Sequence, residues 1–185
     1  MKIVLLACLR MNKAGNVFGG AEKSIINLAN WLAEHTEHEV VLASVEGNEK
    51  AFSISESVIF EGYEINSKQK LLVHISIMQN TKKIIEKHNP DIVISFWIQP
   101  LFYLIINGYK NKVKYIYSER NDPSLEYGSI ARFMRKIVLK YARGIVFQTK
   151  DAQKYFPQNV INKSMVIHNP IYVRINDYVF NDTMD

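Results

Sequence analysis

The sequence predicts an α/β fold in which a mainly parallel sheet carries helices on both faces. Short apolar segments rich in β-branched residues recur along the chain, and most are separated by stretches with helical periodicity. Such alternation is typical of βαβ units. Several segments contain few polar residues, as expected for strands that are buried on both sides. The expected strands are residues 3–8, 39–45, 91–96, 113–118, 144–147 and 164–168, with a short edge strand at 57–60.

The first expected strand leads into a glycine loop and the start of a helix. Residues 18–24 read Phe-Gly-Gly-Ala-Glu-Lys-Ser, and the apolar positions that follow Gly20 have helical spacing. These positions are Ala21, Ile25, Leu28 and Leu32. The free N–H groups and positive dipole end of such a helix would face the carboxyl end of the strand and favour an anion such as a diphosphate. Glycines also serve tight turns for conformational reasons alone, so a purely structural role stays open.

The glycine loop lacks both of the common phosphate-binding signatures. Gly15 and Gly20 have the spacing of a P-loop, but Ala21 stands where that motif needs a lysine. The sequence contains no Gly-x-Gly-x-x-Gly either. A nucleotide site of either common type is therefore not expected here.

Two longer helices are also expected. One covers residues 67–88 and ends at Asn89-Pro90, because proline disfavours a helical residue before it. The other covers residues 130–141, which have an apolar stripe and a basic face. The stripe is Ile130, Phe133, Met134, Ile137, Val138 and Tyr141, and the basic face is Arg132, Arg135, Lys136, Lys140 and Arg143. This composition suits a membrane-surface helix, but the stripe also suits packing on a sheet, and we prefer a core helix with a solvated basic side.

The composition indicates one globular domain with anionic partners. The chain has 185 residues, and 23 Lys and Arg against 18 Asp and Glu give a net charge of +5. No recognition helix, zinc finger or RNA-binding aromatic motif points to nucleic acid. The lone Cys8 favours a reduced, cytoplasmic setting. No apolar run approaches the roughly 20 residues of a transmembrane helix.

Four short motifs occur in order along the chain. They are Gly-Gly-Ala-Glu at 19–22, His-Asn-Pro-Asp-Ile-Val-Ile-Ser at 88–95, Ser-Glu-Arg-Asn-Asp-Pro at 118–123 and Val-Ile-His-Asn-Pro-Ile at 166–171. Together they resemble the N-terminal half of a family 4 retaining glycosyltransferase, and the resemblance covers residues 2–171. It implies the GT-B architecture, in which two Rossmann-like domains face each other across a cleft. This sequence would supply the first domain.

The resemblance also implies roles for residues on the donor and acceptor sides of the cleft. Gly19 and Gly20 match the glycine loop that lies against the donor diphosphate and the transferred sugar. Glu22 would lie near the donor sugar, although a favourable interaction with the helix dipole explains it equally well. Ser95, Phe96 and Trp97 follow a strand and would line the acceptor side.

The loop at Arg120 and Asn121 matches a place where many family members carry a cleft-facing histidine. No histidine stands here, and Arg120 would instead pair with a phosphate or hold an acceptor hydroxyl. These two residues are the candidate catalytic pair. Asn169-Pro170 resembles the crossing point into the second domain. We therefore expect residues 1–170 to form the domain and residues 171–185 a tail or the start of the interdomain connection.

The resemblance implies transfer of a sugar from a nucleotide-sugar donor to a polysaccharide or lipid-linked acceptor. The expected setting is the cytoplasm, with peripheral contact at the inner face of a membrane. The sequence has no Asp-x-Asp pair, and we expect neither a metal nor another cofactor. In the family, the second domain holds the groups that bind the nucleotide, so this chain alone is expected to be inactive. The alternative is a non-catalytic acceptor-binding or scaffold subunit with the same fold.

Overall fold

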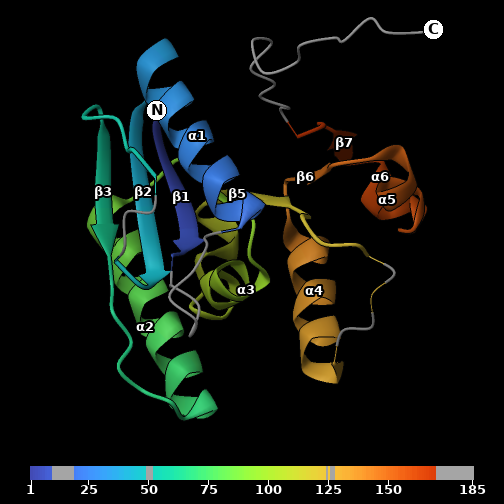
Figure 1. The fold of residues 1–185 in the computed structure, drawn as a ribbon. Coiled ribbons are helices and arrows are strands. Elements are labelled where there is room, and N and C mark those ends of the chain that lie inside the picture. The colour runs from blue at the N-terminus through green and yellow to red at the C-terminus, as the bar shows by residue number, and fades with distance from the viewer. Residues whose placement is uncertain (10–18, 49–51, 124, 126–127, 170–185) are drawn as a thin grey trace, which may run out of the picture.

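The structure is a computed structural model that describes residues 1–9, 19–48, 52–123, 125 and 128–169. Within these residues seven strands form one sheet, every neighbouring pair of strands is parallel, and the order is β3-β2-β1-β4-β5-β6-β7 (Figure 1). The strands are β1 (Lys2–Cys8), β2 (Glu39–Glu46), β3 (Val58–Gly62), β4 (Ile92–Ser95), β5 (Lys114–Ser118), β6 (Gly144–Phe147) and β7 (Ser164–Val166). All the strands expected from the sequence are confirmed.

The helices agree with the sequence pattern where that pattern is periodic. They are α1 (Gly20–His35), α2 (Lys70–His88), α3 (Ile98–Ile106), the 3₁₀ turn η1 (Tyr109–Asn111), α4 (Ser129–Tyr141), α5 (Lys150–Lys154) and α6 (Gln158–Ile161). The sequence did not predict α3. Seven of its nine residues are buried, and its nearly uniform hydrophobicity leaves no polar face to reveal a helical period.

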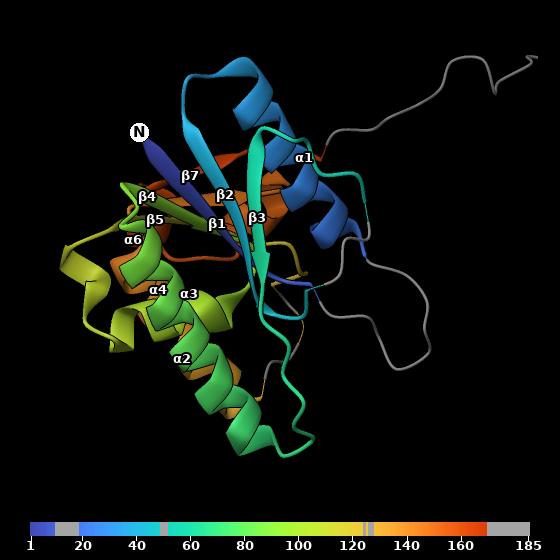
Figure 2. The same ribbon diagram turned by 90° about the vertical axis from the view of Figure 1, so that its left-hand side faces the viewer.

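The sheet carries helices on both faces, as Figures 1 and 2 show. Ile3 and Leu5 of β1 belong to the core under α1, whereas Val4 and Leu6 belong to the core under α2, α3 and α4. This alternation follows from the two-residue period of a strand. None of the four side chains is more than 4% exposed. Burial of each one stabilises the fold by about 1.5–3 kcal/mol.

Helix α2 ends where the sequence predicted. Asn89 follows its last residue in the left-handed conformation, with φ 43°, and its N–H donates to the carbonyl oxygen of Ile85 at 2.9 Å. Pro90 comes next and cannot continue the helix, because it has no N–H. The turn then leads directly into β4.

The packing of α4 differs from the predicted apolar stripe. Met134 is buried as expected, but Ile130 is 70% exposed and Phe133 is 58% exposed. Arg135, which was expected on the basic outer face, has a side chain that is only 12% exposed and lies 4.0 Å from the Glu119 carboxylate. The prediction was wrong here because it considered hydrophobicity alone. A buried carboxylate draws a cation to the inner side of the helix, and two apolar residues lie on the outer side.

The strand order reverses between β1 and β4. From β1 the chain moves outward through β2 to β3, returns to β4 on the other side of β1, and continues away from it to β7. In open parallel sheets the loops that follow two such strands separate and leave a crevice at the carboxyl ends, where ligands bind. Here Gly19 and Gly20 stand where the loop after β1 enters α1, and Phe96 and Trp97 follow Ser95, the last residue of β4.

Candidate functional site

The first turn of α1 is open at the carboxyl edge of the sheet. Gly19 is the N-cap residue and Gly20 the first helical residue, and both are exposed. Gly19 has no side chain, so the N-cap residue itself leaves the first N–H groups of the helix without a side-chain acceptor. A Cβ atom at Gly20 would meet no described atom within 4 Å, and φ there is not positive. Among the described residues, neither packing nor backbone conformation therefore requires glycine at this position.

A cavity of about 630 Å³ lies at the point where the strand order reverses between β1 and β4. It is enclosed by the first turn of α1, the end of β4 and the start of α2. It brings Glu22 and Trp97 together at one surface. The sequence analysis missed several of its polar members, because they come from the end of β2 and from the segment leading into α2. The full lining is Cys8, Glu22, Glu46, Ser67, Lys68, Lys70, Val73, His74, Ile77, Trp97 and Gln99.

The charged groups in this cavity are of both signs. Glu46 ends β2 and is only 9% exposed. Lys68 and Lys70 stand at the start of α2, where the positive end of the helix dipole adds to their charge. The ring of His74 is held by Tyr103, whose hydroxyl lies 2.8 Å from Nδ1. Such a lining offers carboxylates for hydroxyl donors and cations for anionic oxygens.

Ser95 shapes the wall of this cavity without forming part of it. Its side chain has no exposed surface, and its Oγ donates to the carbonyl oxygen of Leu6 at 2.7 Å. The same Oγ accepts the N–H of Trp97 at 3.1 Å. Contrary to its expected place among the acceptor-binding residues, Ser95 lies behind the surface. It holds the turn that places Trp97 at the cavity.

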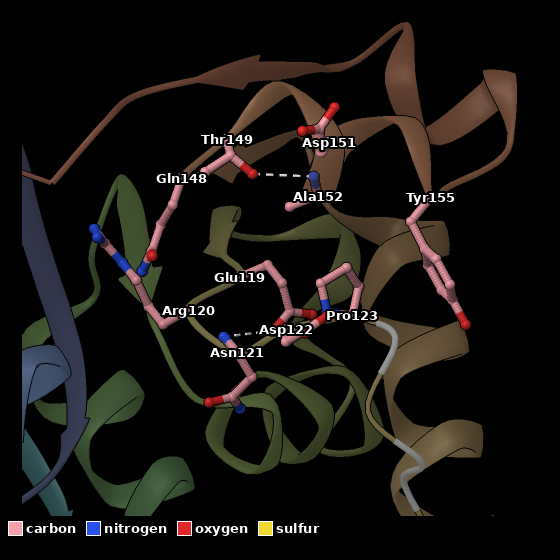
Figure 3. A pocket seen from close by; sticks show the side chains of 10 residues that line it. All are labelled: Glu119, Arg120, Asn121, Asp122, Pro123, Gln148, Thr149, Asp151, Ala152 and Tyr155. Carbon is pink, nitrogen blue, oxygen red and sulfur yellow. Dashed lines mark hydrogen bonds between the residues drawn. The ribbon is translucent and has the colours of Figure 1, made fainter.

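A second pocket, of about 490 Å³, opens between the ends of β5 and β6. Figure 3 shows that its side chains come from the loop after β5 and from the segment between β6 and the end of α5, where the Thr149 hydroxyl accepts the N–H of Ala152 at 3.0 Å. The expected catalytic residues Arg120 and Asn121 lie here. The lining is Glu119, Arg120, Asn121, Asp122, Pro123, Gln148, Thr149, Asp151, Ala152 and Tyr155.

Arg120 is fixed by neighbours on two sides. Its guanidinium lies over the Phe96 ring, 4.0 Å from the centroid, and its Nη1 donates to Oδ1 of Asn169. A desolvated cation over an aromatic ring is worth on the order of 2 kcal/mol. Partial burial lowers the pKa of Arg120 from its ordinary value. The structure thus joins Arg120 to Asn169, a residue expected at the crossing point between domains, while Pro170 lies outside the described residues.

Glu119 is the buried acid of the second pocket, and the sequence analysis did not single it out. It is 2% exposed, and burial raises the pKa of its carboxyl, against the lowering effects of the Asn121 N–H, Tyr117 and Arg135. The Asn121 N–H donates to Oε1 at 3.3 Å. The available signal was a charged residue directly after an apolar strand. Its carboxylate organises the loop that carries Arg120 and Asn121.

The predicted site residues therefore fall into two groups along one edge of the sheet. Glu22 and Trp97 line the cavity beside β1 and β4, whereas Arg120 and Asn121 line the pocket after β5. The Phe96 ring joins the groups, because it precedes Trp97 in the chain and supports Arg120. Both groups face the carboxyl ends of parallel strands, where a ligand spanning the edge could contact each of them.

Comparison with known families agrees with this geometry. The family model described as Glycosyltransferase Family 4 matches residues 18–174. The chain belongs to glycosyltransferase family 4. The matched region includes the glycine loop, the turn after β4 and the loop after β5, and it contains every residue that lines the two pockets except Cys8. A search of curated protein sequences gave no match.

Solved structures share the fold over almost the whole chain. Sucrose-phosphate synthase from Thermosynechococcus elongatus has a TM-score of 0.69 and 12% identity, over 90% of this chain and 47% of that one. The apo lipopolysaccharide outer core galactosyltransferase WaaB has a TM-score of 0.63 and 18% identity, over 92% of this chain and 46% of that one. Anabaena Alr3699/HepE in complex with UDP has a TM-score of 0.59 and 17% identity, over 92% of this chain and 44% of that one. This chain spans less than half the length of these proteins.

The family match and the fold together define the chain as the N-terminal, Rossmann-like domain of a GT-B glycosyltransferase. Across the described ranges, none of the helices combines the length and the hydropathy that crossing a bilayer requires.

Proposed function

We propose that this chain forms the acceptor-side half of an enzyme that transfers a sugar from a nucleotide-sugar donor to a polysaccharide or lipid-linked acceptor, with retention of configuration. The observation that carries the proposal is the cavity of about 630 Å³ at the point where the strand order reverses between β1 and β4. It places Glu22 of the first turn of α1 on the same surface as Trp97. The helix end suits a diphosphate and the indole suits a sugar ring. Membership of family 4 supports the reaction class.

The donor enters at the glycine loop in this proposal. Exposed Gly19 and Gly20 leave room for a phosphate beside the first N–H groups of α1. The helix dipole, with Lys68 and Lys70 across the cavity, stabilises the negative charge that develops on the leaving diphosphate. A uridine diphosphate sugar is the favoured donor, because Anabaena Alr3699/HepE has been solved with UDP and with UDP-glucose.

The acceptor lies against Trp97. The indole is half-buried and packs on the Phe96 ring, with 6.2 Å between ring centroids, so it has a fixed orientation at the cavity wall. The carboxylates of Glu22 and Glu46 accept hydrogen bonds from sugar hydroxyls. Arg120 and Asn121, one strand further along, hold an acceptor hydroxyl or a phosphate oxygen.

Transfer requires a second domain in this proposal. The chain spans less than half the length of the solved proteins that it resembles. In the proposal, a second domain supplies the groups that hold the base and most of the diphosphate. Asn169-Pro170 leads toward that domain. The complete enzyme works in the cytoplasm, at the inner face of a membrane.

The two tryptophans of the chain allow a direct test of the cavity. The Trp31→Phe variant leaves Trp97 as its single tryptophan, and Trp97→Phe is the matched control that leaves Trp31. Trp31 lies in a different groove, between α1 and the strands β4 to β7, which does not contain Trp97 but is also lined by Phe96 and Arg120. Each variant is titrated with UDP-glucose, UDP-galactose and UDP-N-acetylglucosamine while its tryptophan emission is recorded.

We expect at least one of these nucleotide sugars to change the emission of Trp97 in a saturable way at millimolar concentration, because the chain alone binds weakly. The emission of Trp31 stays constant over the same range. Emission from Trp97 that none of the three nucleotide sugars alters, or equal changes at both tryptophans, would contradict a donor site at this cavity.

A further inference from the structure

His74 lines the cavity of about 630 Å³ and is hydrogen-bonded on its inner side to Tyr103. The Tyr103 hydroxyl lies 2.8 Å from Nδ1 of His74, and the two rings meet edge to face with 6.2 Å between their centroids. Tyr103 is 8% exposed and packs edge to face on the Phe102 ring, with 5.4 Å between centroids. The pair joins α2 to α3, so the core of the domain holds the imidazole in one orientation.

The burial of Tyr103 decides which atom donates in this hydrogen bond. Burial raises the pKa of the Tyr103 hydroxyl, which therefore keeps its proton at neutral pH. Within the described part of the chain, Nδ1 of His74 is the only hydrogen-bond partner of that hydroxyl. A proton on Nδ1 would leave the buried hydroxyl without an acceptor for its own proton, which costs free energy. The hydroxyl therefore donates, Nδ1 accepts, and the neutral ring carries its proton on Nε2.

Nε2 is the polar atom of His74 that Tyr103 does not engage. It lies on the other side of the half-buried imidazole, at the wall of the cavity. Among the residues that the structure describes, Nε2 has no hydrogen-bond partner. Its N–H is thus a donor of fixed direction that a ligand in the cavity can use.

The α2 side of the cavity offers donors and cations. Lys70 lies four residues before His74, so both side chains lie on the same side of the helix, and Lys68 precedes them in the segment leading into α2. The first turn of α2 has no acidic residue. The carboxylates of the cavity, Glu22 and Glu46, come instead from α1 and β2. A neutral N–H donor beside cations matches an anionic oxygen.

We propose that His74 binds an anionic oxygen of the ligand through its Nε2–H, next to Lys70, and that Tyr103 is the positioning residue that keeps the proton on Nε2. This oxygen belongs to the diphosphate of the donor or to an acidic group on the acceptor. The inference rests on the proposed function, because it assigns a ligand group to the same cavity. A fixed imidazole adds a directed hydrogen bond that a flexible lysine ammonium group does not supply.

Nitrogen-15 NMR of the chain tests the tautomer. At pH 8 the ring signals show which nitrogen of each neutral imidazole carries the proton. His35 is the internal control, because its Nδ1 lies 3.0 Å from the carbonyl oxygen of Trp31, which can only accept. We expect the proton on Nδ1 in His35 and on Nε2 in His74.

The positioning role of Tyr103 has a matched control in the same core. Tyr103→Phe keeps the ring but removes the hydroxyl, and it should release His74 into a mixture of tautomers. Tyr115→Phe removes a buried hydroxyl that donates to the carbonyl oxygen of Val138, and it should leave the His74 signals unchanged.

Titrations of the same NMR signals test the binding role. The probes are inorganic pyrophosphate, UDP-glucose, glucuronic acid and uncharged glucose. We expect at least one oxyanion to move the Nε2 signal of His74 in a saturable way, and glucose to leave it in place. A response to pyrophosphate and UDP-glucose assigns the donor diphosphate, whereas a response to glucuronic acid alone assigns an acidic acceptor.

Two substitutions of His74 separate binding from packing. His74→Gln keeps an N–H near the position of Nε2, whereas His74→Asn keeps a partner for Tyr103 near the position of Nδ1 and loses the outer donor. Affinity for the responding oxyanion is measured from backbone amide shifts at the cavity. We expect His74→Gln to bind within about threefold of the wild type and His74→Asn about tenfold more weakly, because only the first retains the hydrogen bond to a charged group. A purely structural role predicts the reverse order.

Three results would overturn the assignment. They are a proton on Nδ1 of wild-type His74, a His74 signal that no oxyanion moves or that glucose moves equally, and binding by His74→Asn as tight as by His74→Gln. The proposed function fails separately. A Trp97 emission that no nucleotide sugar alters would leave a response of His74 to pyrophosphate or glucuronic acid untouched, and a Trp97 response without a His74 response would refute this inference alone.

Discussion

The guanidinium of Arg120 lies 4.0 Å from the centroid of the Phe96 ring. Arg120 follows β5 and Phe96 follows β4, so the contact joins the ends of two neighbouring parallel strands. Its Nη1 also donates to Oδ1 of Asn169, which lies far along the chain. A planar cation held both on its face and at its edge is a rigid group for binding an oxyanion. This arrangement gives Arg120 a defined place at the rim of the cleft.

Replacing Arg120 by lysine should lower kcat/KM of the complete two-domain enzyme by about 10- to 100-fold. Lysine keeps the charge but loses the planar group that stacks on Phe96, and a hydrogen bond to a charged group is worth roughly 1.5–3 kcal/mol. The measurement is initial-rate kinetics with a UDP-sugar donor. Arg143→Lys is the matched control, because that arginine is exposed just beyond the C-terminal end of α4, and it should keep wild-type kinetics. Unchanged kcat/KM in Arg120→Lys would remove Arg120 from the catalytic machinery.

Replacing Gly20 by valine should weaken donor binding without destabilising the fold. Its Cβ meets no described atom within 4 Å, so the free energy of unfolding should change by less than ~1 kcal/mol, while the added bulk blocks the approach of a phosphate to α1. We expect at least about tenfold weaker UDP-sugar binding in calorimetry of the complete enzyme, equivalent to roughly 1.4 kcal/mol.

Gly62→Ala is a control in which stability, and not donor binding, should change. A Cβ there would lie 2.5 Å from the Cα of Asn48, so this substitution should cost about 1–3 kcal/mol of stability and leave the donor affinity of the folded protein unchanged. Wild-type donor affinity in a well-folded Gly20→Val variant would contradict the donor role of the glycine loop.

The stability contribution of Glu119 should depend on pH. Burial raises the pKa of its carboxyl above the ordinary value of 4.5, so the folded protein binds its proton more tightly than the unfolded chain does. The free energy of unfolding of the wild type should therefore fall, relative to Glu119→Gln, as the pH rises from about 4.5 through the raised pKa. Urea denaturation of both proteins at several pH values measures this difference. A difference that does not vary with pH, or that varies in the opposite direction, would contradict a raised pKa.

Hydrophobic pattern and turn chemistry were sufficient to predict most of the fold. The strands are short apolar segments, and β1 and β2 consist almost entirely of residues that can be buried on both sides. The end of α2 was readable because Asn89-Pro90 is a strong local signal. Helix α3 was missed because it is buried on nearly every side and has no polar period to detect.

The candidate site was less predictable, because it depends on contacts between distant segments. Glu22 and Trp97 were expected at the cleft from local motifs, and the structure places them at one cavity. No local pattern indicated that Glu46 and His74 would join them. Likewise, hydrophobic periodicity placed Arg135 outside, whereas the charge of buried Glu119 places it inside. Burial of a charged group is set by its tertiary partner, which a periodicity argument does not include.

Sugar transfer by residues 1–185, measured with and without a second domain, tests the central claim most directly. Radiolabelled UDP-glucose, UDP-galactose and UDP-N-acetylglucosamine are each incubated with a membrane lipid and polysaccharide extract, and the label that enters the acceptor fraction is counted. Positioning of donor and acceptor together supplies several kcal/mol of barrier reduction, and this chain holds only one side of that arrangement. The account predicts no transfer by the chain alone and transfer when a matching C-terminal GT-B domain is fused to it or added in trans. Robust turnover by residues 1–185 without a second polypeptide would contradict it.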